Sequence, residues 1–241
     1  MRLIVLSGPP SSGKTSVLRY SLGHLIKEGK RAAVVKLDCL VGGDEKDYKK
    51  SGIECVTGLS GFICPDHYLA TNIDRIIAWG RSKKLDFLVI ESAGLCNRCS
   101  PHLEGVLAVS VMDMLSGMNT PRKVGPLLKS ADIVILTRGD IISQTEREVF
   151  RVRVSEVNRK ARVLEVNGLT GQRTLMLAKQ MKKAPVLKIK HKLQLRYPMP
   201  SAVCSFCLGE RRVGEEFAGG NVKLMELPEK SQIRKKKELE V

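Results

Sequence analysis

Aromatic residues are scarce in this sequence. Phe, Trp and Tyr together make up 4% of the 241 residues, and Trp occurs once. Proteins that bind single-stranded nucleic acid stack the bases on aromatic side chains, so this composition argues against such a surface. No nucleic-acid-binding motif is recognisable either. We therefore do not expect nucleic acid to be the main partner.

Long apolar runs are also absent. No segment has enough consecutive apolar residues to span a bilayer. The opening "MRLIVLSGPP" is apolar only briefly and leads into a glycine motif, which is typical of a buried strand and not of a signal peptide. We expect a cytoplasmic protein with no membrane partner. Because thiols stay reduced in the cytoplasm, the seven cysteines are candidates for ligands, reactive groups or small core residues, and not for disulfides.

Acidic residues are in deficit. The chain has 25 Asp and Glu against 41 Lys and Arg, which gives a formal net charge of +16. This excess predicts an anionic partner, which can be a nucleotide, a nucleic acid or an acidic protein surface. Much of the positive charge lies late in the chain, in residues 179–196 and 230–240. Both runs have two open interpretations, a docking surface or a solvated face and tail.

Short apolar runs alternate with amphipathic segments up to about residue 183. The apolar runs are typical of parallel strands buried on both faces, and they span residues 2–7, 31–37, 86–91, 131–137 and 161–167. Segments 14–29 and 145–158 have helical periodicity. Such alternation predicts an α/β fold with a doubly wound, mainly parallel sheet over residues 1–183.

The pattern changes after Lys183. Apolar and basic side chains alternate over residues 187–196, which predicts a half-exposed strand with one basic face. Two prolines and a Cys-x-x-Cys pair follow, and residues 219–227 have the pattern of another short strand. We expect a small, cysteine-bearing C-terminal appendage at 184–227 and a charged tail at 228–241.

The most specific motif is "GPPSSGKT" at residues 8–15. It matches G-x-x-x-x-G-K-[ST] and lies between a predicted buried strand and a predicted helix, which is the context of a phosphate-binding P-loop. Loop N–H groups and the helix N-terminus attract phosphate, Lys14 reaches the β- and γ-phosphates, and Thr15 holds Mg²⁺. We expect nucleotide contacts from Gly8, Ser11, Ser12, Gly13, Lys14 and Thr15, which makes residues 1–183 a P-loop NTPase domain.

Two acids stand at the ends of predicted strands. Asp38 follows the run at 31–37, and Glu91 ends the run at 86–91. The carboxyl ends of parallel strands line the ligand crevice, so both acids are candidates to hold Mg²⁺ with Thr15 and to act in catalysis with Lys14. The other interpretation of each acid is a helix cap or a surface charge.

The base-binding motif is altered. "ILTRGD" at residues 135–140 ends a predicted strand, where many GTPases carry Asn-Lys-x-Asp. Asp140 occupies the position that reads guanine, whereas Thr137 replaces the asparagine and offers one hydroxyl instead of an amide. GTP is the preferred nucleotide, and ATP remains an alternative.

Residues 1–180 or so resemble the SIMIBI-class GTPases of metalloenzyme maturation, in particular the hydrogenase nickel-insertion and urease accessory GTPases. The resemblance rests on "GPPSSGKT", "KLDCLVGGDEKDYKKSG", "TGLSGFICPDH", "VIESAGLCNRCSPHL", "SADIVILTRGD" and "VNGLTGQ". It implies a homodimer that forms with bound GTP and holds a metal across its interface through a Cys-Pro-His motif. It also implies a client metalloenzyme or its maturation factors as partners. Cys64 and His67 match that motif, with Asp66 inserted.

Cys64 and His67 are the first candidate metal ligands. Thiolate and imidazole bind zinc, nickel or copper, and two such ligands from each chain of a two-fold dimer would complete a site for nickel or zinc. The alternative is a core cysteine with Asp66 as a helix cap.

Two Cys-x-x-Cys pairs are the second set of candidates. Cys96 and Cys99 follow the strand that ends at Glu91, and Cys204 and Cys207 lie in the appendage. Such pairs bind zinc or a [4Fe–4S] cluster, either as one intrachain site or with their symmetry mates. The remaining cysteines and histidines considered are not expected to bind metal. We interpret Cys39 and Cys55 as core residues, and His102 and His191 as surface residues.

The prediction for function is an NTP hydrolase, more specifically a GTPase with slow intrinsic turnover, that acts as a nucleotide-gated metallochaperone. It would assist insertion of nickel or another metal into a client metalloenzyme. Two alternatives stay open. One is an iron–sulfur ATPase of the electron-transfer type with a cluster bridging a dimer at Cys96 and Cys99. The other is a basic binding module with structural zinc.

Overall fold

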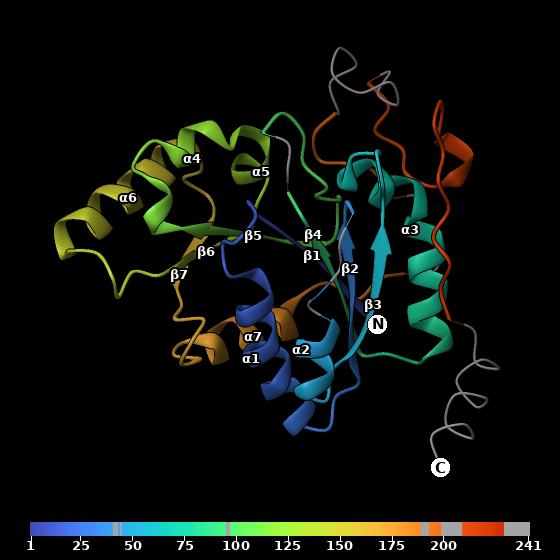
Figure 1. The fold of residues 1–241 in the computed structure, drawn as a ribbon, viewed down its shortest axis with the longest axis horizontal. Helices are drawn as coiled ribbons and strands as arrows, with labels where there is room; N and C mark the ends of the chain where they lie inside the picture. The colour runs from blue at the N-terminus through green and yellow to red at the C-terminus, as the bar shows by residue number, and fades with distance from the viewer. Residues whose placement is uncertain (41–42, 44, 95–96, 189–192, 199–208, 229–241) are drawn as a thin grey trace.

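A computed structural model describes residues 1–40, 43, 45–94, 97–188, 193–198 and 209–228 (Figure 1). Its centre is a seven-stranded sheet in the order β3-β2-β4-β1-β5-β6-β7, and all neighbouring strands are parallel. The strands are β1 Arg2–Ser7, β2 Ala32–Asp38, β3 Glu54–Leu59, β4 Phe87–Ser92, β5 Leu107–Asp113, β6 Ile133–Thr137 and β7 Arg162–Glu165.

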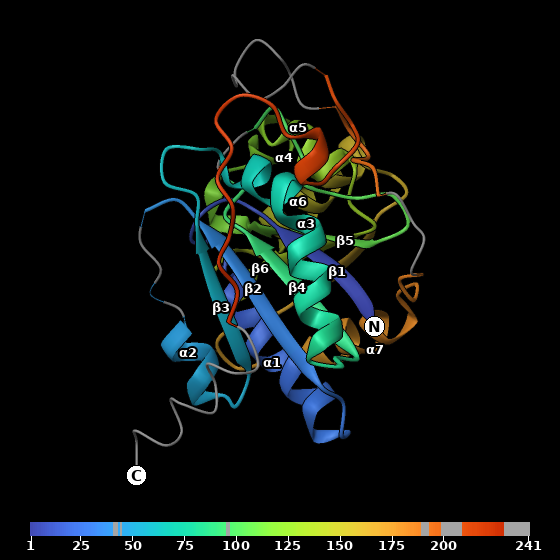
Figure 2. The same cartoon turned by 90° about the vertical axis from the view of Figure 1, so that its right-hand side faces the viewer.

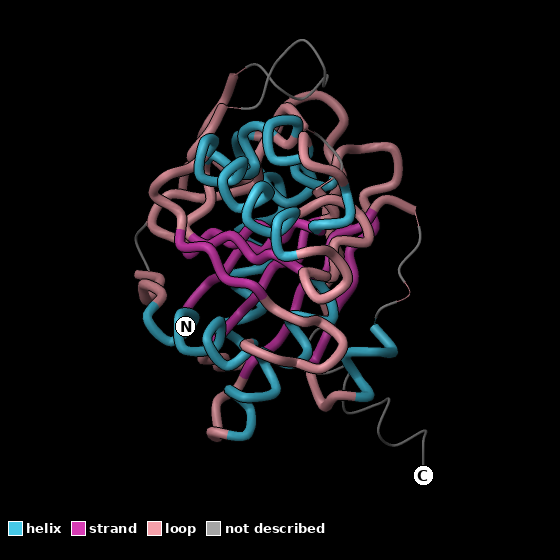
Figure 3. Tube along the Cα trace, turned by 90° about the vertical axis from the view of Figure 1, so that its left-hand side faces the viewer, coloured by secondary structure: helices cyan, strands magenta, loops and turns pink. Residues whose placement is uncertain are grey.

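Helices connect the strands and cover both faces of the sheet. They are α1 Lys14–Lys27, α2 Glu45–Lys50, α3 Pro65–Ser82, α4 Thr120–Lys123, α5 Gly125–Lys129, α6 Gln144–Val157 and α7 Thr174–Lys183, with 3₁₀ turns at Met114–Ser116 and Glu215–Phe217. Helices α1, α2 and α7 lie on one face, and α3 to α6 lie on the other (Figures 2 and 3). The predicted α/β fold with a mainly parallel, doubly wound sheet is confirmed.

The five predicted apolar runs form β1, β2, β4, β6 and β7, and the two predicted helices form α1 and α6. Strands β3 and β5 were not predicted. β3 lies at the edge of the sheet, where its sequence ECVTGL needs no continuous apolar run. β5 lies between β1 and β6, and Ser110, which is fully buried, interrupts its apolar pattern.

The described part of the segment 184–228 packs against the α3 face. Leu193, Leu195, Val213 and Met225 are buried in the same apolar cluster as the side chains of α3. Residues 209–228 run alongside α3 and β3 (Figure 2). This C-terminal segment and α3 therefore belong to the same hydrophobic core on this face of the sheet.

Neither predicted strand in this segment forms as expected among the described residues. The strand predicted at 187–196 is described only in part, and there Gln194 and Leu195 make isolated bridges to Arg212 and Leu103. The strand predicted at 219–227 is wrong. Its backbone is held by a side chain instead of a strand, because the Met225 N–H donates to Asn72 Oδ1 at 2.7 Å.

None of the helices in the described part of the chain has the length and apolar character needed to cross a membrane.

Candidate functional site

The P-loop turns sharply between β1 and α1. A Cβ atom at Gly8 would collide with the Val111 carbonyl oxygen of β5, so only glycine fits there. Ser11 and Gly13 have positive φ angles of 59° and 88°. These conformations turn successive N–H groups toward a common point, as anion-binding nests do. Ser12 Oγ is buried and makes no hydrogen bond within the described residues, so the loop retains a polar group suited to phosphate.

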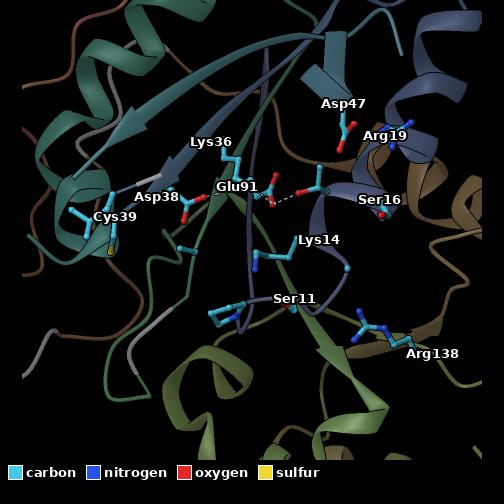
Figure 4. Close-up of a pocket in the computed structure, with 15 residues that line it drawn as sticks. Ser11, Lys14, Ser16, Arg19, Lys36, Asp38, Cys39, Asp47, Glu91 and Arg138 are labelled. Carbon is cyan, nitrogen blue, oxygen red and sulfur yellow. Dashed lines mark hydrogen bonds and ion pairs between the residues drawn. The ribbon is translucent and has the colours of Figure 1, made fainter. Parts of the chain in front are cut away.

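A cavity of about 600 Å³ opens beside this loop (Figure 4). Six of the predicted residues line it, namely Ser11, Gly13, Lys14, Thr15, Asp38 and Glu91. Two basic residues of the lining, Arg19 and Lys36, were not predicted from the sequence, and Arg138 lines the cavity as well. Lys36 had a sequence signal, because it is the one charged residue inside the apolar run of β2. The lining thus combines four basic side chains, which can attract phosphate, with the acids Asp38, Asp47 and Glu91.

Lys14 lies across the P-loop. Its ammonium group donates hydrogen bonds to the carbonyl oxygens of Gly8 and Pro9 at 2.9 and 2.8 Å. Burial lowers the pKa of Lys14 to about 8, Lys36 acts in the same direction, and the charges of Glu91 and Asp38 oppose the shift. The ammonium can exchange loop carbonyls for phosphate oxygens with little movement.

Glu91 is the most enclosed acid of the cavity, with 1% of its surface exposed. Its carboxylate accepts hydrogen bonds from Thr15 Oγ1 at 2.9 Å and from the Tyr48 hydroxyl at 2.6 Å. Lys36 Nζ lies 3.8 Å from Glu91 Oε1 and 3.6 Å from Asp38 Oδ2. Figure 4 shows Lys36, Asp38 and Glu91 next to one another, close to Lys14 of the P-loop. A hydroxyl with two carboxylates is an oxygen donor set that fits Mg²⁺.

The two residues predicted to read the base lie apart from one another. The Thr137 hydroxyl donates to the Ser12 carbonyl oxygen at 2.8 Å and is buried beneath the P-loop. Asp140 lines a second cavity of about 190 Å³, which it shares with Asn167, Gln172 and Arg173 from the β7–α7 loop. Thr137 thus supports the phosphate loop, whereas Asp140 faces a separate hollow.

A group of possible metal ligands lies at the N-terminus of α3. Ligand atoms of Cys64, Asp66 and Cys99 all lie within 4.8 Å of one another. Cys99 Sγ donates to Asp66 Oδ2 at 3.4 Å, and Ser92 Oγ donates to Asp66 Oδ1 at 2.7 Å. The side-chain hydrogen bond between Cys64 and Cys99 lowers the pKa of Cys64, whereas burial raises the pKa of Asp66. We call Cys64, Asp66 and Cys99 the thiol–carboxylate group.

His67 is not a member of this group. It is 1% exposed, and burial lowers its pKa to about 4, so the imidazole is neutral near pH 7. The structure thus places Asp66, the residue inserted into the motif, beside Cys64. Among the other predicted ligands, Cys96, Cys204 and Cys207 lie outside the described residues. Cys55 is buried as predicted, but Cys39 is half-buried and lines the nucleotide cavity.

The interpretation of His102 as a surface residue is wrong, because the side chain is completely buried. Its Nε2 lies 2.7 Å from Ser7 Oγ, and its Nδ1 lies 2.8 Å from Ser130 Oγ. Ser130 Oγ also lies within hydrogen-bond distance of the Pro126 carbonyl oxygen, at 2.7 Å. Burial lowers the pKa of His102 to about 3. The interpretation of His191 as a surface residue falls outside the described residues.

A family model described as the nucleotide-binding domain of CobW/HypB/UreG matches residues 2–165. An uncharacterized protein of Methanocaldococcus jannaschii is 47% identical over 220 residues, which are 91% of this chain and 94% of that protein. The urease accessory protein UreG of Yersinia pestis is 31% identical over 150 residues, covering 57% of this chain and 68% of UreG.

Solved structures share the fold. The hydrogenase maturation factor HypB from Archaeoglobus fulgidus has a TM-score of 0.61 at 16% identity, over 76% of this chain and 89% of HypB. HypB from Helicobacter pylori, solved in complex with nickel, has a TM-score of 0.59 at 17% identity, over 78% and 91% of the two chains. With the P-loop, the flanking acids and the family match over most of the chain, this protein belongs to the CobW/HypB/UreG family of P-loop nucleotide-binding proteins.

Proposed function

We propose that this protein is a nucleotide-gated metallochaperone, a GTPase that assists insertion of nickel or another transition metal into a client metalloenzyme. The observation that best supports this proposal is that the cavity beside the P-loop and the thiol–carboxylate group lie at the same edge of the sheet. Asp38 and Cys39 line the cavity. Their carbonyl oxygens accept hydrogen bonds at 2.8 Å from the N–H groups of Ser60 and Gly61, which lead into Cys64. Family membership favours this function over the iron–sulfur ATPase and the basic binding module.

The nucleotide roles follow from position. Lys14 binds the β- and γ-phosphates, and the P-loop N–H groups and Ser12 hydroxyl surround them. Thr15, Asp38 and Glu91 are the residues that would hold Mg²⁺, which supplies charge neutralisation of the phosphates when bound. We assign GTP ahead of ATP because Asp140 stands where a guanine-reading acid is expected. We expect slow turnover because Arg138, a candidate for a transition-state cation in the cavity lining, is ion-paired with Asp113.

The cargo site is the thiol–carboxylate group. Two thiolates and one carboxylate are ligands for zinc or nickel, and three ligands leave a position open for transfer to a client. A second chain in a nucleotide-dependent dimer can close that position. Cys64 and Asp66 lie at the N-terminus of α3, where the helix dipole favours the anionic forms of their side chains.

The direct test is metal affinity with and without nucleotide. We expect Ni²⁺ or Zn²⁺ to bind at least about fivefold more tightly with GTP and Mg²⁺ than without. Cys64→Ser should weaken metal binding by at least about tenfold, and Lys14→Ala should remove the nucleotide effect and leave basal metal binding. Cys55→Ala is the control, since Cys55 lies outside the group. Equal metal affinity and stoichiometry in the two nucleotide states would overturn the proposal.

A further inference from the structure

The last two residues of β4 belong to different sites. Glu91 accepts hydrogen bonds from Thr15 and Tyr48 at 2.9 and 2.6 Å, on the side of the nucleotide cavity. The next residue, Ser92, donates to Asp66 Oδ1 at 2.7 Å, on the side of the thiol–carboxylate group. Successive side chains of a strand point to opposite faces of a sheet, so one short piece of backbone contacts both sites.

Two sets of hydrogen bonds are thus joined through the β4 backbone, and all of their members except Thr15 are buried. Glu91 and Asp66 are each 1% exposed, Ser92 is fully buried, and Cys99 is 4% exposed. The set on the metal side also includes the bond that Cys99 Sγ donates to Asp66 Oδ2 at 3.4 Å. Since Ser92, Asp66 and Cys99 are closed off from solvent, losing one of their hydrogen bonds favours a rearrangement of the other partners.

The backbone that follows β4 rests on the P-loop. Gly94 has a φ angle of 58°, and a Cβ atom there would collide with the carbonyl oxygen of Gly8. The N–H group of Ala93 donates to the Leu37 carbonyl oxygen at 3.1 Å, which ties the same stretch to β2. The end of β4 is therefore packed between the phosphate loop and the strand that carries Asp38, and it cannot shift independently of them.

We propose that Ser92 is the positioning residue through which the nucleotide state regulates the thiol–carboxylate group. This inference rests on the proposed metallochaperone function and names the regulation of its metal site. A ligand that engages the Thr15 hydroxyl removes a hydrogen bond from the buried Glu91 carboxylate. The carboxylate and the end of β4 then readjust, and the adjacent Ser92 moves Asp66 relative to Cys64 and Cys99.

A purely structural role is the competing explanation, in which Ser92 only satisfies a buried acid. The two explanations predict different couplings between nucleotide binding and metal binding. If Ser92 carries the coupling, its removal lowers the effect of nucleotide on metal affinity and the effect of metal on nucleotide affinity by the same factor, because binding coupling is reciprocal. If Ser92 is only structural, both affinities can fall while their coupling factor stays unchanged.

The experiment measures that coupling factor in the full chain. Co²⁺ is the probe, followed by its thiolate charge-transfer absorption, in the presence of Mg²⁺ with and without a non-hydrolysable GTP analogue. The affinity for the analogue is measured in turn with and without Co²⁺. The matched control is Ser110→Ala, since Ser110 on β5 is also fully buried and its hydroxyl makes no hydrogen bond within the described residues.

We expect the wild type and Ser110→Ala to share a coupling factor of about five or more, and Ser92→Ala to give a factor near one. Nucleotide affinity of Ser92→Ala without metal should stay within about twofold of wild type, because Ser92 does not line the nucleotide cavity. Ser92→Thr and Ser92→Val form a second, size-matched pair, in which only the hydroxyl differs, in case Ser92→Ala folds poorly. Thr should retain the coupling and Val should lose it.

Two results would overturn the inference. The first is a coupling factor equal to that of the wild type in Ser92→Ala, or in both Ser92→Thr and Ser92→Val. This result would be compatible with the metallochaperone function but would show that Ser92 does not regulate it. A coupling factor of one in the wild type would remove the nucleotide gating itself, and this inference with it.

Discussion

At the scale of single residues, the nucleotide cavity contains a buried carboxylate, Glu91, whose charge is stabilised by hydrogen bonds and by an ion pair. Glu91 is surrounded by two hydroxyl donors and one ammonium group, from Thr15, Tyr48 and Lys36. Burial and the charge of Glu91 raise the pKa of Tyr48, which keeps its hydroxyl protonated as a donor. Glu91 can therefore remain inside the protein, where an unpaired acid would be costly.

Tyr48→Phe should expose this dependence. The change removes a 2.6 Å hydrogen bond to Glu91 and leaves that oxygen one donor short. We expect the free energy of unfolding to fall by about 2 kcal/mol, as for hydrogen bonds to charged groups. Tyr20→Phe is the control, because the Tyr20 hydroxyl also makes a 2.6 Å bond, to the Leu169 carbonyl, but is exposed. Urea unfolding of both variants is the measurement, and equal losses would contradict the prediction.

Two buried histidines should make the fold sensitive to acid. Burial lowers the pKa of His102 to about 3 and that of His67 to about 4, from an ordinary value of 6.5. Between those values the unfolded chain binds protons that the folded chain does not. The free energy of unfolding should therefore fall as the pH drops below about 6.5, by up to about 1.4 kcal/mol per pH unit for each histidine.

Urea unfolding between pH 7.5 and pH 5 measures this slope. His102→Gln should be less stable at neutral pH, because it loses the bonds to Ser7 and Ser130, but its stability should change less steeply with pH. An unchanged slope in His102→Gln would assign the acid sensitivity to other groups.

At the scale of elements, the end of β4 and the P-loop form one packed unit. The contact is between backbones, since Gly94 lies against Gly8 with no room for a Cβ atom. Strand β4 also lies between β1 and β2 in the sheet, so the P-loop strand and the Asp38 strand flank it. The geometry of the phosphate site is therefore set by three adjacent strand ends.

Gly94→Ala should displace the P-loop. Its Cβ atom would collide with the Gly8 carbonyl, so we expect nucleotide affinity to fall by at least about tenfold, since misplacing a binding group strongly reduces its contribution. Gly105→Ala is a matched control. Gly105 has a similar φ angle of 69°, but nothing lies within 4 Å of its Cβ position. It should lose about 1–2 kcal/mol of stability from backbone strain and retain nucleotide affinity. Fluorescent nucleotide titration and thermal unfolding distinguish the two effects.

At the scale of the whole molecule, the segment after α7 completes the core on the α3 face. Leu193, Leu195, Val213 and Met225 are at most 8% exposed and pack in the cluster that contains Ile73 and Ile76. Hydrogen bonds between Asn72 and the backbone of Lys223 and Met225 fix the segment against α3. Since α3 begins at Cys64 and Pro65, this segment also supports the helix that presents the thiol–carboxylate group.

Met225→Ala should therefore destabilise the whole protein. The side chain is 3% exposed, and truncating a buried methionine costs about 2–5 kcal/mol of unfolding free energy. Leu224→Ala is the control, because Leu224 is 37% exposed and should cost less than about 1 kcal/mol. A single unfolding transition shifted as a whole is expected. A separate early transition in Met225→Ala, with the main transition unmoved, would instead indicate an independent appendage.

Much of the fold, and six of the residues that line the cavity beside the P-loop, could be predicted from the sequence because they depend on local patterns. Central parallel strands are buried on both faces and so require apolar runs, as in β1 and β4. The edge strand β3 has no such requirement, and the buried Ser110 interrupts the run in β5. Lys36 and Tyr48 were missed because their role depends on Glu91, which is distant in sequence and close only in the folded chain.

The sequence by itself determined the P-loop, the strands that carry Asp38 and Glu91, and the family to which the chain belongs. Each of these is encoded by neighbouring residues, whose spacing fixes the chemistry. Only the tertiary structure decided that Asp66 and Cys99 join Cys64, because the three come from the start of α3 and from the loop after β4. Local spacing favoured His67, but the packing of that loop against the α3 N-terminus brings a distant thiol beside an adjacent carboxylate.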